Sequence, residues 1–136
     1  MKSCIPAIRS LLIAHAPLLA LVKTGTGQPR VYLMRAEQFT AGGDIIIGEV
    51  SGMMGFTLDQ GSTDPWEMRI SLECRASTYA QCILISETAK DCLLPFTGHA
   101  SGLNVHGIEH ASEYSDYSDE GTVFRHTVDF RVHYGP

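Results

Sequence analysis

Residues 68–76, MRISLECRA, and residues 123–134, VFRHTVDFRVHY, alternate apolar and polar side chains almost without a break. Successive side chains of a β-strand point to opposite faces of a sheet, so a period of two predicts two strands, each with one buried and one solvent-facing side. The solvent-facing side is charged and not merely polar. Its charged members are Arg69, Glu73, Arg75, Arg125, Asp129 and Arg131. We therefore expect the function of this sheet to lie on a charged surface.

The size and composition of the chain predict one globular domain over residues 1–136. Its 136 residues can bury a sizeable core, and 44% hydrophobic with 18% charged residues argues against disorder. The formal net charge of -5 disfavours a dedicated nucleic-acid binder, because phosphate contacts usually require a basic surface.

Four scattered cysteines, at positions 4, 74, 82 and 92, do not form a disulfide framework. They predict buried free thiols in a protein made in a reducing cytoplasm. The N-terminal apolar run is interrupted by Arg9, His15 and Pro17, which disfavours a signal peptide, and no stretch approaches the roughly 20 apolar residues of a membrane span. We expect no membrane association.

Periodicity and turn residues together predict an α+β domain with a mostly antiparallel β-sheet. An N-terminal helix and a second helix, at about 78–94, should pack on one face of that sheet. The expected elements are a helix over about 3–15, a short helical turn over 18–22, strands over 31–35, 44–50, 66–76, 103–111 and 122–134, and loops over 59–65 and 112–121. Residues 53–58 are a candidate continuation of the strand 44–50 beyond a bend at Ser51-Gly52.

Motifs for catalysis and for metal or cofactor binding are weak. His106 and His110 lie four residues apart in an expected strand, and no closely spaced cysteine pair accompanies them, as structural zinc sites usually show. His126 falls on the apolar side of the last strand, where a hydrogen-bonded core histidine is the simpler interpretation. No glycine-flanked serine elbow is present. We expect no enzymatic activity, no cofactor and no metal.

The acidic segment 112–121 has two interpretations. Asp116, Asp119 and Glu120 are typical of a solvated loop. Tyr114 and Tyr117 add the aromatic contact area that is common in protein interfaces, which favours a partner-binding loop instead.

The order of several short motifs resembles the tail-completion, or tail-terminator, proteins of long-tailed phages and of phage-derived gene transfer agents. The resemblance covers about residues 5–134. The motifs are an N-terminal helix ending near a proline, Arg30-Val31-Tyr32, the strand 69–76 followed by a helix that opens Ser77-Thr78-Tyr79-Ala80, the segment Glu113-Tyr114-Ser115-Asp116, and the closing strand 125–132.

This resemblance implies a small α+β subunit that assembles into a ring, with six copies expected. The ring would end the tail tube, bind the tail-tube protein and the head-tail connector or adaptor protein, and let DNA pass transiently through its lumen. The protein would then be located in the virion tail, at the head-tail junction. A mildly acidic subunit agrees with this role, because a lumen that bound phosphates tightly would slow the DNA.

The charged strand faces connect the two lines of reasoning, because a ring joins two different patches of neighbouring subunits and complementary charges can set the closing angle. We expect subunit or lumen contacts at Arg69, Glu73, Arg75, Tyr114, Asp116, Tyr117, Asp129 and Arg131. Three alternatives remain open: a solvated sheet face, a different virion connector such as a head-completion protein or tail-tube subunit, and a small ligand- or metal-binding domain that uses the histidines.

Overall fold

The structure is a computed structural model that describes residues 2–22, 27–35, 42–57, 61–118 and 123–136. In chain order, the elements within these ranges are α1 (Ile5–Ala14), α2 (Ala16–Val22), β1 (Val31–Leu33), β2 (Gly43–Thr57), β3 (Gly61–Ala76), α3 (Tyr79–Leu93), β4 (Gly98–Ala100), β5 (Leu103–Tyr117) and β6 (Phe124–Gly135).

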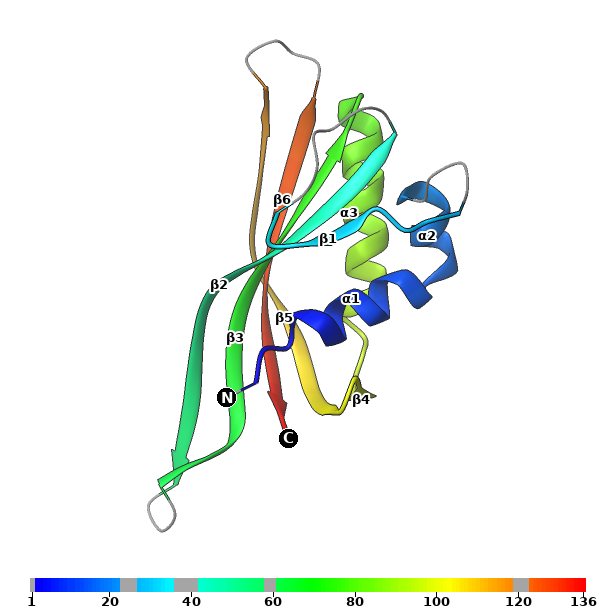
Figure 1. Cartoon of the computed structure of the whole chain (residues 1–136). Coiled ribbons are helices and arrows are strands. Elements are labelled where there is room, and N and C mark those ends of the chain that lie inside the picture. The colour runs from blue at the N-terminus through cyan, green and yellow to red at the C-terminus, as the bar shows by residue number, and fades with distance from the viewer. Residues whose placement is uncertain (1, 23–26, 36–41, 58–60, 119–122) are drawn as a thin grey trace.

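The strands form one sheet in the order β1-β2-β3-β6-β5-β4, in which β1 runs parallel to β2 and the remaining neighbours are antiparallel. All three helices lie on the same side of the sheet (Figure 1). The predicted α+β class, the mostly antiparallel sheet and the one-sided helices are therefore confirmed. The other side of the sheet has no helix among the described residues.

The centre of the sheet is the pair β3–β6, which keeps one continuous register from Trp66 opposite Tyr134 to Ala76 opposite Phe124. The alternation predicted from the sequence is confirmed in both strands. The apolar members point toward the helices and are buried: Met68, Ile70, Leu72, Cys74, Ala76, Val128, Phe130, Val132 and Tyr134. The charged members lie on the opposite face, where they are partly or fully exposed.

The helices cover this apolar face because their own apolar residues recur at helical spacing. In α1 the buried residues include Ile5, Ile8 and Leu12. Helix α3 begins after Thr78, whose side-chain oxygen accepts a hydrogen bond from the Gln81 amide at 3.2 Å, and it ends close to the predicted boundary.

Helices α1 and α2 join at His15, as the proline at position 17 predicted. Among the described residues, no single helix has the length and apolarity to cross a membrane. Together α1 and α2 would meet that criterion of length and composition, but they bend by 93° at their junction.

Two predicted loops are partly wrong, since Gly61–Pro65 belongs to β3 and Ser112–Tyr117 belongs to β5. The β2–β3 hairpin extends beyond the part of the sheet that the helices cover, whereas the β5–β6 hairpin lies beside the start of α3 (Figure 1). Because Ser112–Tyr117 are exposed on both faces of β5, the sequence there has no apolar alternation, and backbone pairing alone marks the strand. The remainder of the predicted acidic loop, with Asp119 and Glu120, lies outside the described residues.

Sequence periodicity also missed β4, a strand of only three residues. It pairs with the start of β5 through a turn in which Ser101 and Gly102 both have positive φ, 48° and 81°. Turns of this kind match the twist of an antiparallel hairpin, and glycine adopts the required conformation without strain.

The central register makes Phe130 a sharp test of the fold. Phe130 is 0% exposed, and Phe130→Asp would place an unpaired charge in the core. We expect it to lower the free energy of unfolding by more than about 4 kcal/mol, enough to prevent folding of a marginally stable domain. Circular dichroism and urea denaturation would measure this. Arg131→Asp, one residue later on the exposed face, is the control, and a folded Phe130→Asp protein would contradict the assignment of faces.

Candidate functional site

The sheet side without helices carries most of the residues predicted to be functional, and we call it the charged face. Register places alternate residues of β3 from Glu67 to Arg75 on it, together with alternate residues of β6 from Arg125 to His133. Asp44 of β2 lies opposite Arg75, and Tyr114 and Asp116 of β5 lie opposite Thr127 and Arg125. The structure thus brings together all but one of the predicted site residues. The exception is Tyr117, which pairs with Phe124 and faces the helix side.

Arg75 forms a two-point ion pair with Asp44. Its Nε and Nη2 atoms donate to the two carboxylate oxygens at 2.8 and 2.6 Å, and the side chains are only 14% and 7% exposed. The hydrogen bond to Asp44 raises the pKa of the Arg75 guanidinium, so the charge is held at every relevant pH. Because the pair is shielded from water, losing either partner would leave a charge without compensation. Arg75 therefore has a structural role within the subunit.

Arg69 connects the three strands β3, β6 and β5. Its Nε and Nη2 atoms donate to one carboxylate oxygen of Asp129 at 3.2 and 3.0 Å, and Nη2 also lies 3.1 Å from the Ser112 hydroxyl. These contacts run across the strands and stabilise their register, as cross-strand pairs of opposite charge do.

Arg125 makes the corresponding contact at the other end of the face. Its guanidinium donates to both carboxylate oxygens of Asp116 at 2.7 and 3.1 Å, and it lies 4.0 Å from Glu73. The hydrogen bond to Asp116 raises the pKa of Arg125. Asp116 is therefore an ordered strand residue and not part of a solvated loop.

Arg131 differs from the other three arginines on this face. It is exposed, and it has no hydrogen bond or ion pair with any residue that the structure describes. The nearest acidic residue in register is Glu109, whose carboxylate instead accepts from His133 at 2.6 Å. A guanidinium has five donors, so Arg131 retains its full capacity to bind an anion.

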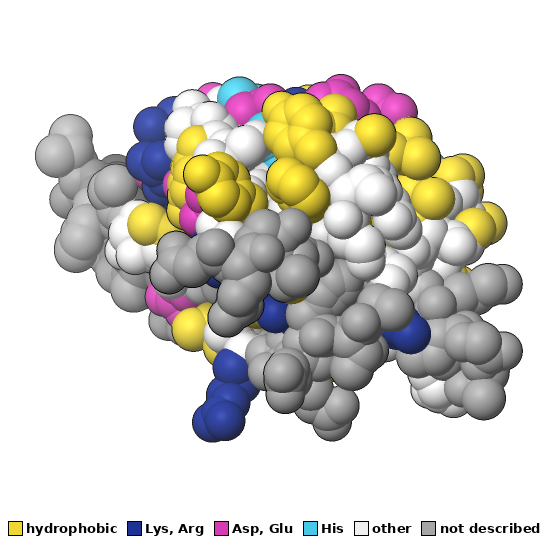
Figure 2. All heavy atoms as spheres, turned by 90° about the horizontal axis from the view of Figure 1, so that it is seen from above, with side chains coloured by type: hydrophobic (Ala, Val, Ile, Leu, Met, Phe, Trp, Pro, Cys, Tyr) yellow, Lys and Arg dark blue, Asp and Glu magenta, His cyan; other side chains and the backbone are white. Residues whose placement is uncertain are grey.

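Exposed tyrosines lie on both faces of the sheet at the end formed by the β5–β6 hairpin. On the helix side Tyr117 is 65% and Tyr79 52% exposed, and the ring of Tyr79 meets Phe124 edge-on at 6.4 Å; on the charged face Tyr114 is 60% exposed. Figure 2 looks onto this end of the molecule and shows hydrophobic side chains on the surface with acidic side chains beside them. Large exposed rings of this kind are typical of protein interfaces.

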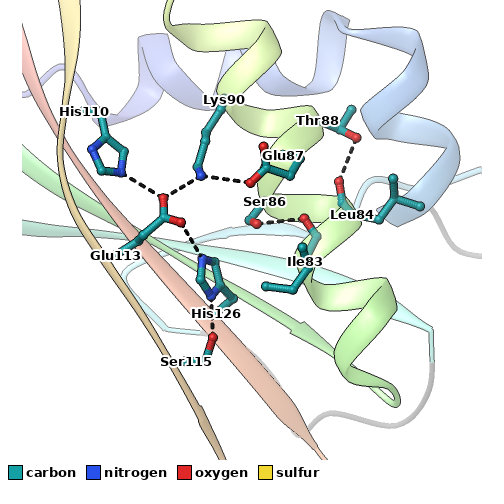
Figure 3. A network of polar contacts seen from close by, with 10 residues as sticks. All are labelled: Ile83, Leu84, Ser86, Glu87, Thr88, Lys90, His110, Glu113, Ser115 and His126. Atoms are coloured by element: carbon teal, nitrogen blue, oxygen red, sulfur yellow. Dashed lines mark hydrogen bonds and ion pairs between the residues drawn. The ribbon is translucent and has the colours of Figure 1, made fainter.

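On the helix side, Glu113 is the centre of a polar network that sequence reasoning missed (Figure 3). Its carboxylate binds Lys90 of α3 at 2.5 Å, His110 at 2.8 Å and His126 at 3.3 Å. The other ring nitrogen of His126 lies 2.6 Å from the Ser115 hydroxyl. The prediction that His126 is a hydrogen-bonded core histidine is thereby confirmed. The sequence signal for its partner was the carboxylate of Glu113, two residues before Ser115.

Charge in this network shifts two pKa values. The Lys90 ammonium, followed by the two histidines, lowers the pKa of Glu113 to about 2 against the opposing effect of burial. Burial acts to lower the pKa of Lys90, but its bonds to Glu113 and Glu87 outweigh that effect and raise it. The pair therefore stays charged at neutral pH and joins α3 to β5.

The remaining candidates from the sequence are the four cysteines and His106. The four cysteines are free, and burial raises the pKa of Cys4 to about 12. A bulge between Val105 and Gly107 interrupts the alternation around His106. Within the described ranges, no group of three or more His, Cys, Asp or Glu side chains is placed to hold a metal ion.

The Glu113 network predicts a pH-dependent contribution to stability. At pH 7, Glu113→Gln should lower the free energy of unfolding by about 1–2 kcal/mol, because Lys90 loses its ion pair. The lowered pKa stabilises the fold only while the carboxylate is ionised. The difference from the unmodified protein should therefore shrink as pH falls from 4.5, the ordinary value, toward about 2.

Urea unfolding at a series of pH values would measure this difference. Glu87→Gln is the matched control, because Glu87 also contacts Lys90 but is 56% exposed, and its effect should be smaller. A deficit for Glu113→Gln that stays constant from pH 7 to pH 3 would contradict the account.

Comparison with known proteins finds a protein family and solved structures that resemble this chain. The model of the family Tail completion protein gp17 matches residues 6–135. Among solved structures, a chain of the virion of a native gene transfer agent particle superposes with a TM-score of 0.76 at 17% identity, over 96% of this chain and 93% of that one. At that identity the superposition shows a shared fold.

No curated protein matches the chain in sequence. The family match nevertheless spans nearly the whole chain, including both alternating strands, the helices and the charged face. The chain therefore belongs to the tail completion protein gp17 family, and it is a structural protein of the phage virion tail.

Proposed function

We propose that six copies of this protein form a ring that terminates the tail tube and joins it to the head connector, with DNA passing through the lumen. Its partners are the tail-tube protein on one side and the head-tail connector or adaptor protein on the other. The family supports a role in completing the tail. The observation that carries the ring is the presence of two long unpaired edges on one sheet.

Each outer edge of the sheet is covered over only a short length. Strand β1 pairs with β2 at Ile45–Ile47, and β4 pairs with β5 at Leu103–Val105. Among the described residues, no strand lies outside β2 from Gly48 to Thr57 or outside β5 from His106 to Tyr117. Rows of unpaired backbone groups bind further strands readily, and proteins rarely leave such long edges without a partner.

The directions of these edges suit a ring. Strands β2 and β5 run antiparallel to each other, because each neighbouring pair from β2 through β3 and β6 to β5 is antiparallel. If β5 of one copy lies beside β2 of the next in the same orientation, the two strands pair antiparallel. The two contact surfaces differ, so the contact repeats around a closed ring when its angle allows.

Exposed apolar side chains support contact at both edges. Leu33, Met34 and Val50 are 40%, 60% and 52% exposed on the side of β1 and β2. Tyr114 and Tyr117 are exposed on β5 at the other edge. In this arrangement Tyr114, Asp116 and Tyr117 lie at the contact between subunits.

The charged face would then line the lumen, with the helices on the outside of the ring. Arg69, Glu73, Arg75, Asp129 and Arg131 belong to this face, and most of their charge is paired within the subunit. A surface of paired charges on a chain of net charge -5 binds DNA phosphates weakly, which favours passage of DNA.

A different small virion connector, such as a head-completion protein or a tail-tube subunit, is the second candidate, because free sheet edges also suit subunits that stack into tubes. A ligand- or metal-binding domain has less support, since His110 and His126 belong to the Glu113 network and His133 pairs with Glu109.

Imaging of particles distinguishes a terminator from a tube subunit. Electron microscopy with an antibody against this protein should show one ring per particle, of six copies, at the end of the tail next to the head. Antibody bound along the whole tail would indicate a tube subunit and contradict the proposal, as would antibody bound only within the head.

Substitutions at the two edges test how the ring closes. Val50→Lys and Tyr114→Lys each remove an exposed apolar contact and add a charge, so we expect association to weaken by about tenfold or more. Leu84→Lys on α3 is the control, because Leu84 is 51% exposed and lies on neither edge.

Sedimentation would measure association of the purified proteins, and incorporation into particles would measure it where the ring forms only on the tail. Unchanged thermal unfolding would establish that the variants are folded. Normal ring assembly by both edge variants would refute closure through these edges.

A further inference from the structure

The charged face contains a hollow of about 280 Å³ beside an irregularity in β2. It is lined by Ser51, Gly52, Glu67, Arg69 and Arg131. The register between β2 and β3 shifts between Glu49 and Ser51, so one residue of β2 bulges out of the ladder at this point. Such bulges bend a strand locally, and the small residues that follow leave open space above β3 and β6.

Two arginines meet across this hollow in an unfavourable arrangement. Arg69 and Arg131 are direct cross-strand partners, and like charges at such positions destabilise a strand pair. Asp129 and Ser112 bind Arg69, whereas Arg131 has no partner among the described residues. Glu67 also lines the hollow, and its carboxylate lies 3.8 Å from His133. One guanidinium in the hollow is thus left to bind an outside anion.

We infer that this hollow accepts the carboxylate side chain of an acidic residue from a partner protein that lies along the charged face. Arg131 would bind the two carboxylate oxygens, in the planar two-point geometry that guanidinium groups favour, and the Ser51 hydroxyl is available as a further donor. This inference deepens the proposed function and rests on it, because the proposed function places the charged face inside the ring.

Three observations favour a protein carboxylate over a DNA phosphate. The hollow lies near the lower end of the size range of ligand pockets, which suits one side chain. Glu67 lines the hollow, and Glu109 and Asp129 flank Arg131 in register and in sequence, so a phosphate backbone, which places several charges along the face, is repelled more strongly than a single carboxylate. The chain also has no excess of basic residues to hold a phosphate backbone.

Titration with small probes tests the site on the intact protein. With ¹⁵N-labelled arginine side chains, N-acetylglutamate should shift the Arg131 Nε–H signal saturably in the millimolar range, and uncharged N-acetylglutamine should not. Arg131→Gln should weaken N-acetylglutamate binding by about tenfold. Arg35→Gln, at an exposed arginine that does not line the hollow, should leave it unchanged.

Three results would overturn the inference: no saturable shift at Arg131, equal shifts with N-acetylglutamine, or tighter binding of inorganic phosphate than of N-acetylglutamate. Phosphate preference would assign the hollow to a nucleic-acid backbone instead. Imaging of unmodified particles separates this result from the proposed function. A normal ring whose isolated subunit fails the titration refutes the hollow alone, whereas absence of a ring in unmodified particles refutes the proposed function and leaves the titration result standing.

Discussion

The antiparallel pairing of β3 with β6 is the constraint on which the rest of this structure depends. The two strands are central in the sheet, and their register runs without a break from Trp66 opposite Tyr134 to Ala76 opposite Phe124. A shift of one residue in either strand would turn its apolar side chains to water and its arginines toward the helices. The helices, the charged face and the two outer hairpins all take their positions from this one pairing.

Much of the fold could be predicted because burial on one face leaves a period in the sequence. Arg69, Glu73, Arg75, Asp129 and Arg131 alternate with buried residues, so their common face followed from the strand period alone. Helix α3 was equally visible, through Thr78 at its start and apolar residues at helical spacing. Prediction failed at Gly61–Pro65 and at Ser112–Tyr117, and the second of these segments is exposed on both faces of β5. Both segments are strands held by backbone pairing, and their sequences give no period to detect.

The candidate site was harder to predict than the fold, because the sequence gives residues and not their partners. The shared exposure of Arg75 and Arg131 suggested equal roles, yet Arg75 is shielded in a two-point pair with Asp44 and Arg131 has no described partner. That difference depends on Asp44, which lies on another strand and far away in the chain. Glu113 is a similar case. Its network joins β5, β6 and α3, so it becomes visible only when the three elements are assembled.

The unequal cover of the two outer strands has a geometric consequence. Gly48 of β2 lies level with Ser112 of β5, because Ser71 and Asp129 connect them in register. The free part of β2 begins at Gly48 and extends in one direction from that level. The free part of β5 extends from His106 to Tyr117, on both sides of it. Neighbouring copies that matched the full length of both edges would therefore be displaced along the strand direction. Repeated around a closed assembly, this displacement is the shear of a barrel, and it would tilt every strand against the central axis. The lengths of β1 and β4, which decide how much of each edge is free, would in this way help to set both the tilt of the strands and the diameter of the channel.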